Sequence, residues 1–367
     1  MQTKIIELES IRGLAAILVF LGHIPSWYDS FHQVTLIRNG GLMVELFFVL
    51  SGFVIFSTYG TRINSLKQIA KFQFLRFGRL YPIHLTFLLL FVGFELMKLL
   101  FIANPVSPPF AAGISGPREF LENLTLTQAL GFSRKPDSFN GPSWSISTEF
   151  YTYLVFAFIA LVFSRRQLHV HAGLLIALAF LLAADLPVLS DFSRFMTCLA
   201  GFSSGCLVAM FVGWIRSMEV VLPSFAPLFS ALLLIAFLAI QPRGSGIDIV
   251  VTFGLSAILI VTIVCSSDGW IKRTLRTKPL VVVGLHSYSL YMCHWAVIYM
   301  ADVILKRTFM VPMTSPMSAG QLGPGLGVIG FVAVLLLVCG AVALISWASF
   351  RFIEQPSRMK SRAYVYR

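Results

Sequence analysis

The stretch SIRGLAAILVFLGHIPSW, residues 10–27, decides what kind of fold this chain adopts. It is apolar enough to cross a membrane, yet it carries Arg12 near one end and His23 near the other. A charged or titratable side chain is costly in hydrocarbon, so such residues face a bundle interior or a water-filled cavity. The stretch therefore predicts a membrane helix with one polar face.

The composition of the chain excludes several classes of protein. Of its 367 residues, 57% are hydrophobic and 12% are charged, whereas a soluble domain carries about 25% charged residues. The net charge of +12 is explained by basic loops that orient a membrane protein, so we expect no nucleic-acid partner. The five cysteines lie in apolar runs without a C-x-x-C pair, which predicts neither a disulfide framework nor a metal site.

Ten apolar segments are near the length that crosses about 30 Å of hydrocarbon as a helix. None of the connectors between them has the composition of a soluble domain. We therefore expect one all-α integral membrane domain over residues 1–367, with about ten transmembrane helices around a polar cavity. The ten predicted spans are residues 8–27, 39–59, 80–103, 144–163, 169–184 (the shortest), 192–214, 220–240, 246–265, 280–304 and 325–349.

The distribution of basic residues predicts the orientation. With the N-terminus in the cytoplasm, the cytoplasmic segments hold 18 Lys and Arg residues and the opposite side holds 7. Because basic residues accumulate on the cytoplasmic side, we expect both termini there. The longest outer connector is 104–143, in which Pro117 is suited to begin a short helix over 117–131. A connector of this length is either a plain linker or a loop that contacts an acceptor.

The inner segment 61–82, TRINSLKQIAKFQFLRFGRLYP, mixes basic and aromatic residues and contains no acid. This pattern predicts an amphipathic helix near 63–79 at the cytoplasmic interface. Arg76 and Arg79 are three residues apart and share one helical face. Two adjacent guanidiniums suit either a phosphate clamp or attraction to anionic lipid headgroups, and spacing alone leaves both readings open.

Arg12 and His23 lie eleven residues apart, which is about 20° past three full helical turns. They therefore share one face and are separated by about 16 Å along the axis. Arg12 lies nearer the cytoplasmic end and His23 nearer the outside. Imidazole is a common general base near neutral pH, although a hydrogen-bonded histidine between helices is the simpler interpretation.

Other predicted spans also carry polar side chains, and a buried carboxylate among them must pair, protonate or react. Ser287, Tyr291 and His294 are spaced by four and three residues, so they share one helical face. Several such faces from different helices indicate one shared polar site. The remaining polar candidates in the spans are Glu45, Glu149, His286 and Tyr288.

Six motifs in order give the chain a resemblance to acyltransferase family 3, the bacterial membrane acyltransferases that O-acylate glycans, lipid-linked sugars and some antibiotics. One departure is the segment after His294, which reads Trp295, Ala296 and Val297 where the family often has proline. The motifs are LESIRGLAAILVFLGH (8–23), VELFFVLSGFVI (44–55, with Ser51), RFGR followed by LYP (76–82), PSWSISTEFYTY (142–153, with Trp144), SYSLYMCHW (287–295) and FIEQP (352–356).

The resemblance implies roles for residues that match these motifs. His23 would be the catalytic base, while Arg12, Arg76 and Arg79 would bind the phosphates of acyl-CoA. Glu149 would either orient His23 or pair with Arg12. Tyr291 and His294 would supply hydrogen bonds to the thioester carbonyl or to the acceptor, and Ser51, Trp144, Glu45, Ser287 and Tyr288 are further cavity candidates.

The function that the resemblance implies is O-acyl transfer, with acetyl as the expected group, from cytoplasmic acyl-CoA to a hydroxyl of a glycan, lipid-linked sugar or similar acceptor. Acyl-CoA would be a co-substrate, with no tightly bound cofactor, and the protein would lie in the bacterial cytoplasmic membrane. The chain ends at Arg367, so we expect no fused soluble domain of the kind that some family members append. A proton-coupled transporter or flippase of a sugar or lipid would use the same polar cavity and is the second reading. A membrane-anchored structural or sensor protein is the third, but it would need fewer titratable groups inside the membrane than this chain carries.

The charge bias generates a topology prediction. Cysteine labels at Leu66 and within 266–279 should be accessible only from the cytoplasm, whereas labels within 104–140 should be accessible from outside. Labelling of intact cells with a membrane-impermeant thiol reagent measures this. Reaction of Leu66→Cys from the exterior would contradict the orientation.

Overall fold

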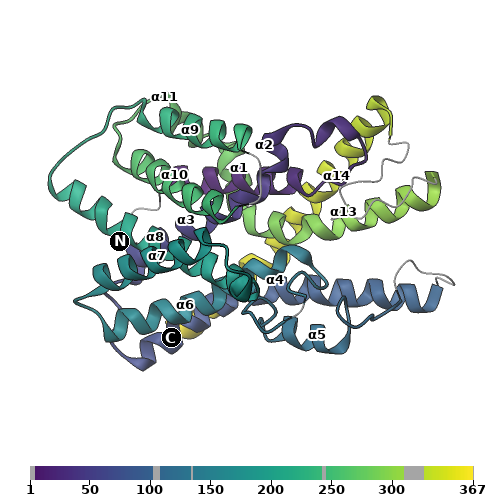
Figure 1. Cartoon of the computed structure of the whole chain (residues 1–367), viewed down its shortest axis with the longest axis horizontal. Coiled ribbons are helices and arrows are strands. Elements are labelled where there is room, and N and C mark those ends of the chain that lie inside the picture. The colour runs from purple at the N-terminus through teal and green to yellow at the C-terminus, as the bar shows by residue number, and fades with distance from the viewer. Residues whose placement is uncertain (1–4, 102–107, 134, 242–244, 310–325, 367) are drawn as a thin grey trace.

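The computed structural model describes residues 5–101, 108–133, 135–241, 245–309 and 326–366. Within these residues the regular elements are helices and no strand is present, which confirms the all-α class (Figure 1). The α-helices are α1 (Ile6–Gly22), α2 (Thr35–Arg38), α3 (Met43–Tyr59), α4 (Leu66–Phe101), α5 (Pro117–Leu124), α6 (Trp144–Val162), α7 (Gln167–Ala183), α8 (Ser193–Ser217), α9 (Ala226–Ile240), α10 (Gly246–Cys265), α11 (Trp270–Leu275), α12 (Lys278–Leu285), α13 (Ser287–Phe309), α14 (Val328–Ser349) and α15 (Gln355–Val365).

The helices are those of an integral membrane protein. Among the described residues, seven helical stretches are long and apolar enough to span a membrane, and α7 and α9 are shorter apolar helices. The first predicted span is α1, which has 17 residues and carries Glu7, Glu9 and Arg12. Helices thus occupy all ten predicted segments, and the two chain termini lie toward the same end of the bundle (Figure 1).

Two boundaries differ from the expected spans. The predicted span 280–304 is divided at His286, so that α12 ends there and α13 begins at Ser287. The division allows α12 to pack against α1, where Gly13 faces Gly284 at backbone contact distance. The first span ends as a helix at Gly22, and His23 is its C-terminal cap. Pro25 follows two residues later, where a continued helix would lose a backbone hydrogen bond.

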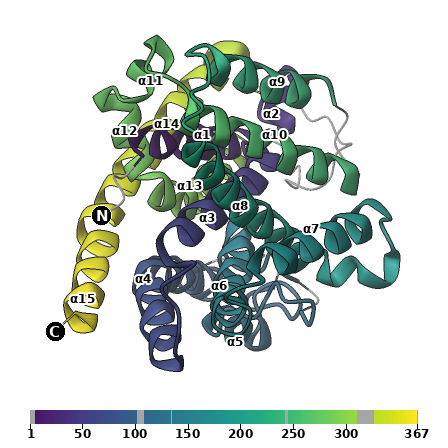
Figure 2. The same ribbon diagram turned by 90° about the vertical axis from the view of Figure 1, so that its left-hand side faces the viewer.

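The segment near 63–79, predicted as an amphipathic helix, is helical from Leu66, and it continues without interruption into the third span as the 36-residue helix α4. The C-terminal part of the chain runs beside it. A five-residue π-helical turn, Phe350–Glu354, joins α14 to α15, and α15 packs along α4 with Ser361 against Gly78 (Figure 2). Glu354 of this turn accepts hydrogen bonds from Ser289 and Arg358, which fixes the start of α13.

The long connector folds against α4. Its helix α5 begins at Pro117 as predicted but ends at Leu124, earlier than residue 131. Tyr81 donates a hydrogen bond to the carbonyl of Leu124, and His84 Nε2 lies 2.8 Å from the carbonyl of Asn123. These contacts satisfy carbonyls that a helix end leaves open. Residues 104–107 and 134 of the predicted connector lie outside the described residues.

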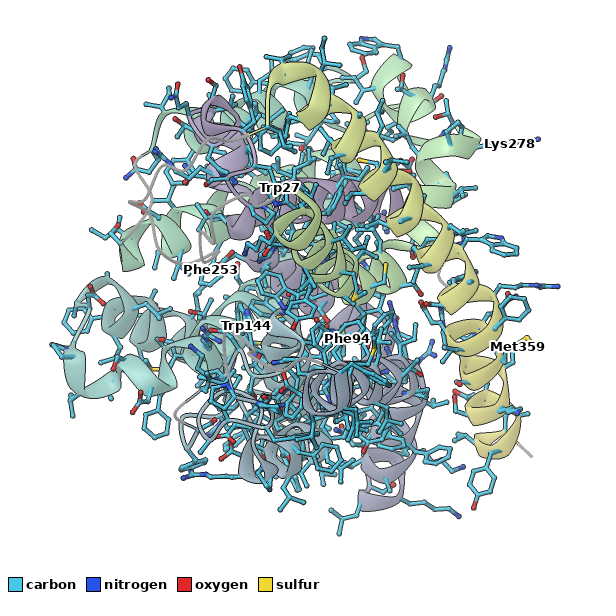
Figure 3. The ribbon with its side chains drawn as sticks, turned by 90° about the vertical axis from the view of Figure 1, so that its right-hand side faces the viewer. Trp27, Phe94, Trp144, Phe253, Lys278 and Met359 are labelled. Atoms are coloured by element: carbon cyan, nitrogen blue, oxygen red, sulfur yellow. The ribbon has the colours of Figure 1, made fainter. Side chains whose placement is uncertain are left out.

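Small residues let α3 and α8 cross closely. A Cβ atom on Gly52 would lie 2.0 Å from the carbonyl oxygen of Phe202, and one on Gly205 would lie 2.0 Å from that of Val49. Helices in lipid gain little from hydrophobic association, so close backbone packing of this type stabilises their contact. Aromatic side chains fill the remaining space, and Figure 3 shows Phe253 and Trp144 within the bundle while Lys278 and Met359 lie at its periphery.

The α3–α8 crossing generates a stability prediction. Gly205→Ala should destabilise the protein by about 1–3 kcal/mol, because the added methyl group forces the two backbones apart. The midpoint of thermal unfolding of the purified protein in detergent should fall accordingly. Gly213→Ala on the same helix is the matched control, because nothing lies within 4 Å of its Cβ position. Equal midpoints for the two variants would argue against a role of the crossing in stability.

Candidate functional site

A polar cavity of about 590 Å³ lies between the helices. It is enclosed mainly by α1, α3, α6, α8 and the start of α13, with Arg79 of α4 and Arg362 of α15 also in its wall. The predicted candidates that line it share a hydroxyl, carboxylate or guanidinium group. They are Arg12, Ser51, Arg79, Glu149, Ser287, Tyr288 and Tyr291.

Four guanidinium groups line the cavity wall. Arg12 and Arg79 both line it, and both side chains are partly buried. A carboxylate oxygen of Glu9 lies 3.6 Å from the guanidinium of Arg12. Arg216 and Arg362 add two exposed guanidiniums to the same wall. Such an arrangement attracts an anion into the cavity.

Arg76 and Arg79 occupy different environments although they share one helical face. Arg76 is not among the residues that line the cavity. Its guanidinium lies 5.6 Å from the ring centres of Tyr59 and Phe72 and 6.0 Å from that of Tyr153, within range of cation–π attraction. Its Nε atom is buried and has no hydrogen-bond acceptor among the described residues. The geometry thus gives Arg79 direct access to the cavity and Arg76 a packing role.

Glu149 is held at the cavity wall by two hydroxyl groups. Its Oε1 atom accepts hydrogen bonds from Ser51 at 2.6 Å and from Tyr153 at 2.5 Å, and these two hydroxyls lie 2.8 Å apart. Of the two partners that the sequence left open, His23 and Arg12, neither makes these contacts.

Tyr291 lies in the cavity wall and also contacts His294. Its hydroxyl donates to the carbonyl of Pro142 at 3.0 Å and lies 2.9 Å from Ser145 Oγ. The ring centre of His294 lies 5.8 Å from that of Tyr291. Tyr288, one residue after Ser287, donates a hydrogen bond to the carbonyl of Leu80 and thereby joins α13 to α4.

His23 and His294 contact each other directly, with 3.3 Å between Nδ1 of His23 and Nε2 of His294. Nδ1 of His23 also lies 2.9 Å from the carbonyl oxygen of Val19, and Nδ1 of His294 lies 3.3 Å from that of Leu290. Carbonyl oxygens only accept hydrogen bonds, so these partners assign the proton of each neutral imidazole to Nδ1. The basic lone pair of His23 then resides on Nε2, and His294 Nε2 can accept from the N–H group of His23.

Two predicted cavity candidates lie behind the wall. Glu45 is buried in the first turn of α3 and is not among the lining residues. Trp144 packs edge-on against Phe48, and the guanidinium of Arg194 lies 5.1 Å from its ring centre. Arg194 also forms two hydrogen bonds of 2.6 and 2.7 Å with Asp137, which ties α8 to the long connector.

Sequence reasoning missed several residues of the cavity wall, among them Tyr153, Ser145, Arg216 and Arg362. Tyr153 follows Glu149 by four residues, so helical spacing could have identified it. Ser145 lies in the quoted motif but has no periodic relation to a titratable group. Arg216 and Arg362 gave no signal beyond their contribution to the charge bias. Within the described part of the chain, no group of three His, Cys, Asp or Glu side chains is placed to hold a metal ion.

The fold and the cavity define an integral membrane protein whose helices enclose a polar site with a basic wall and a histidine pair beside it. A family model described as an acyltransferase domain matches residues 5–349. The chain therefore belongs to acyltransferase family 3, as its motifs indicated.

Two curated proteins illustrate the relationship. The chain is 26% identical to the peptidoglycan O-acetyltransferase OatA of Listeria monocytogenes over 390 residues, which cover 96% of this chain and 55% of that protein. It is 34% identical to the acyltransferase MdmB of Streptomyces mycarofaciens over 172 residues, which cover 42% of this chain and 40% of that protein. The chain thus spans about half the length of the curated relatives it matches. No solved structure matches it.

Proposed function

We propose that the protein is a membrane-bound O-acyltransferase that moves an acyl group, and specifically acetyl, from acyl-CoA to a hydroxyl of a glycan, lipid-linked sugar or similar acceptor. The observation that carries the proposal is the joint presence of a basic cavity and the His23–His294 pair beside Tyr291. The peptidoglycan O-acetyltransferase among the relatives supports a glycan acceptor and acetyl as the group transferred.

In the proposed reaction, Nε2 of His23 accepts the proton of the acceptor hydroxyl as its oxygen attacks the thioester carbonyl. The carbon–sulfur bond then breaks, and the coenzyme A thiolate takes up a proton. His294 acts as a positioning residue, because its Nε2 lone pair faces the Nδ1–H group of His23 and stabilises the imidazolium that forms. A base held in one tautomer and orientation in this way is the recurring arrangement in acyl transfer.

The donor enters from the cytoplasm in this proposal. Both the basic bias of the loops and the cavity support this direction, because Ile5 and Arg362, which lie near the two chain ends, line the cavity. The location would be the bacterial cytoplasmic membrane. Arginines on the donor side and histidines farther out would allow the acyl group to cross the membrane while coenzyme A stays in the cytoplasm.

The direct test is turnover by the purified full-length protein in detergent. Acetyl-CoA and soluble peptidoglycan fragments serve as probes, and the release of free coenzyme A thiol is followed together with the mass of the fragments. We expect thiol release that depends on the glycan and an added acetyl group on the glycan. Transport of a sugar or lipid without any consumption of acetyl-CoA would instead support the transporter alternative.

The base assignment generates a mutational prediction. His23→Ala should lower the transfer rate by about 10²–10⁴-fold, because general base catalysis contributes that much. Acetyl-CoA binding should persist, since Arg12 lies about 16 Å away along the helix. The rate of the unmodified protein should fall at acidic pH, because a protonated imidazole cannot accept a proton.

The matched control for this prediction is His169→Ala, which removes an exposed histidine on α7. This variant should retain the rate and the pH profile. Full transfer activity in a folded His23→Ala protein would refute the assignment and leave His294 as the next candidate for the base.

The two arginines of the RxxR motif should behave differently. Arg79→Ala should weaken acetyl-CoA binding about tenfold or more, because a charge-assisted hydrogen bond contributes roughly 1.5–3 kcal/mol. Arg79→Lys should restore only part of the affinity, since an ammonium group cannot bind phosphate oxygens bidentately. Arg76→Ala should mainly lower thermal stability, because its guanidinium packs among aromatic rings.

Isothermal titration of acetyl-CoA and thermal unfolding measure these two effects separately. Unchanged donor affinity in the Arg79→Ala variant would favour the alternative in which this segment only binds lipid headgroups.

A further inference from the structure

The helix α3 presents a stripe of side chains to the cavity. Residues spaced by three and four positions share one face of a helix, and the cavity-lining residues of α3 include a series with this spacing. The residues of the stripe are Val44, Phe47, Phe48, Ser51, Val54, Ile55 and Thr58. The stripe is apolar before Ser51, which donates a hydrogen bond to Glu149. Its first part therefore has no use in the polar chemistry described above.

Phe47 connects this apolar part to the residues of the proposed reaction. Its ring centre lies 6.0 Å from that of Tyr291, and the two rings are nearly perpendicular. Tyr291 also lines the cavity, and its ring centre lies 5.8 Å from that of His294, which contacts His23. The side chain of Phe47 is only partly buried and lines the cavity, so part of its ring faces the cavity. Two side chains thus separate Phe47 from the proposed base.

We propose that Phe47 limits the length of the acyl group that is transferred, an inference that rests on the proposed function. The thioester carbonyl must come to Tyr291 and the histidine pair in order to react. The acyl chain extends from that carbonyl, and Phe47 offers it a rigid apolar surface without a hydrogen-bonding group. An acetyl group ends in one methyl group, which contacts the ring. Each further methylene group needs space that the ring occupies.

The surroundings of Phe47 keep its ring in place. Phe48, the next residue, is buried, and its ring centre lies 6.0 Å from that of Trp144. Tyr291 is held on the other side by the contact of its hydroxyl with Ser145 Oγ at 2.9 Å. Protein interiors are packed closely, and added volume forces side chains out of their preferred conformations. A longer acyl chain therefore meets resistance at Phe47 that a smaller side chain would remove.

The test compares donors that differ only in chain length. Full-length protein in detergent transfers acetyl, propionyl or butyryl from the corresponding acyl-CoA to soluble peptidoglycan fragments, and thiol release and fragment mass give kcat/KM for each donor. In the unmodified protein, we expect kcat/KM to fall about 10–200-fold from acetyl to propionyl, the usual effect of one methylene group in an apolar pocket. Phe47→Leu should raise the propionyl-to-acetyl ratio about tenfold or more. Phe47→Ala should extend this gain to butyryl.

Two features of the design separate a role in specificity from a general effect on packing. Val54→Ala removes apolar volume from the same stripe, about 10 Å along the helix axis from Phe47, and should leave the chain-length preference unchanged. Phe47→Leu keeps an apolar side chain of moderate size, so it measures the preference even where Phe47→Ala does not fold.

The inference is overturned if the unmodified protein transfers butyryl as readily as acetyl, or if both Phe47 variants keep its preference. Equal broadening by Val54→Ala also overturns it, and so does an equal loss with all three donors in a folded Phe47→Leu protein, which is the result of a structural role. Absence of any turnover by the unmodified protein is a different result, because it refutes the proposed function and the inference with it.

Discussion

The cost of placing polar side chains in hydrocarbon is the constraint on which the rest of this structure depends. α1, α3, α6 and α13 each carry polar groups that no lipid can solvate. The fold meets this cost by turning those faces toward one another, so that Ser51, Tyr153 and Glu149 form one hydrogen-bonded group at the wall of a shared cavity. His23 and His294 likewise contact each other through their ring nitrogens, and each ring also contacts one backbone carbonyl.

Close helix contacts make that arrangement possible. Gly52 and Gly205 let α3 and α8 approach at backbone distance, and Gly52 directly follows Ser51 in the chain. Gly13 and Gly284 do the same for α1 and α12, next to Arg12. Gly13 and Gly52, which lie in the family motifs, therefore have a physical explanation. They bring the backbones together beside the residues that line the cavity.

The cavity wall carries two kinds of polar group that the proposed function uses. Guanidiniums from α1, α4, α8 and α15 line the wall, and Tyr291 connects the wall to the histidine pair. Arg12 and His23 both belong to α1 and its C-terminal cap, whereas the other guanidiniums of the wall come from α4, α8 and α15. Under the proposed function, the basic residues that orient the protein would also bind the donor, since both tasks require them on one side.

The sequence by itself determined the all-α membrane class, the helical segments and the family, because helical periodicity, hydropathy and motif order are local properties. It could not place Glu149 with Ser51 and Tyr153, separate Arg76 from Arg79, or bring His294 to His23. Those contacts join helices that are far apart in the chain, and only tertiary packing decides them. Arg216 and Arg362 carried no local signal, because an arginine at a helix end looks the same whether it faces lipid, water or a cavity.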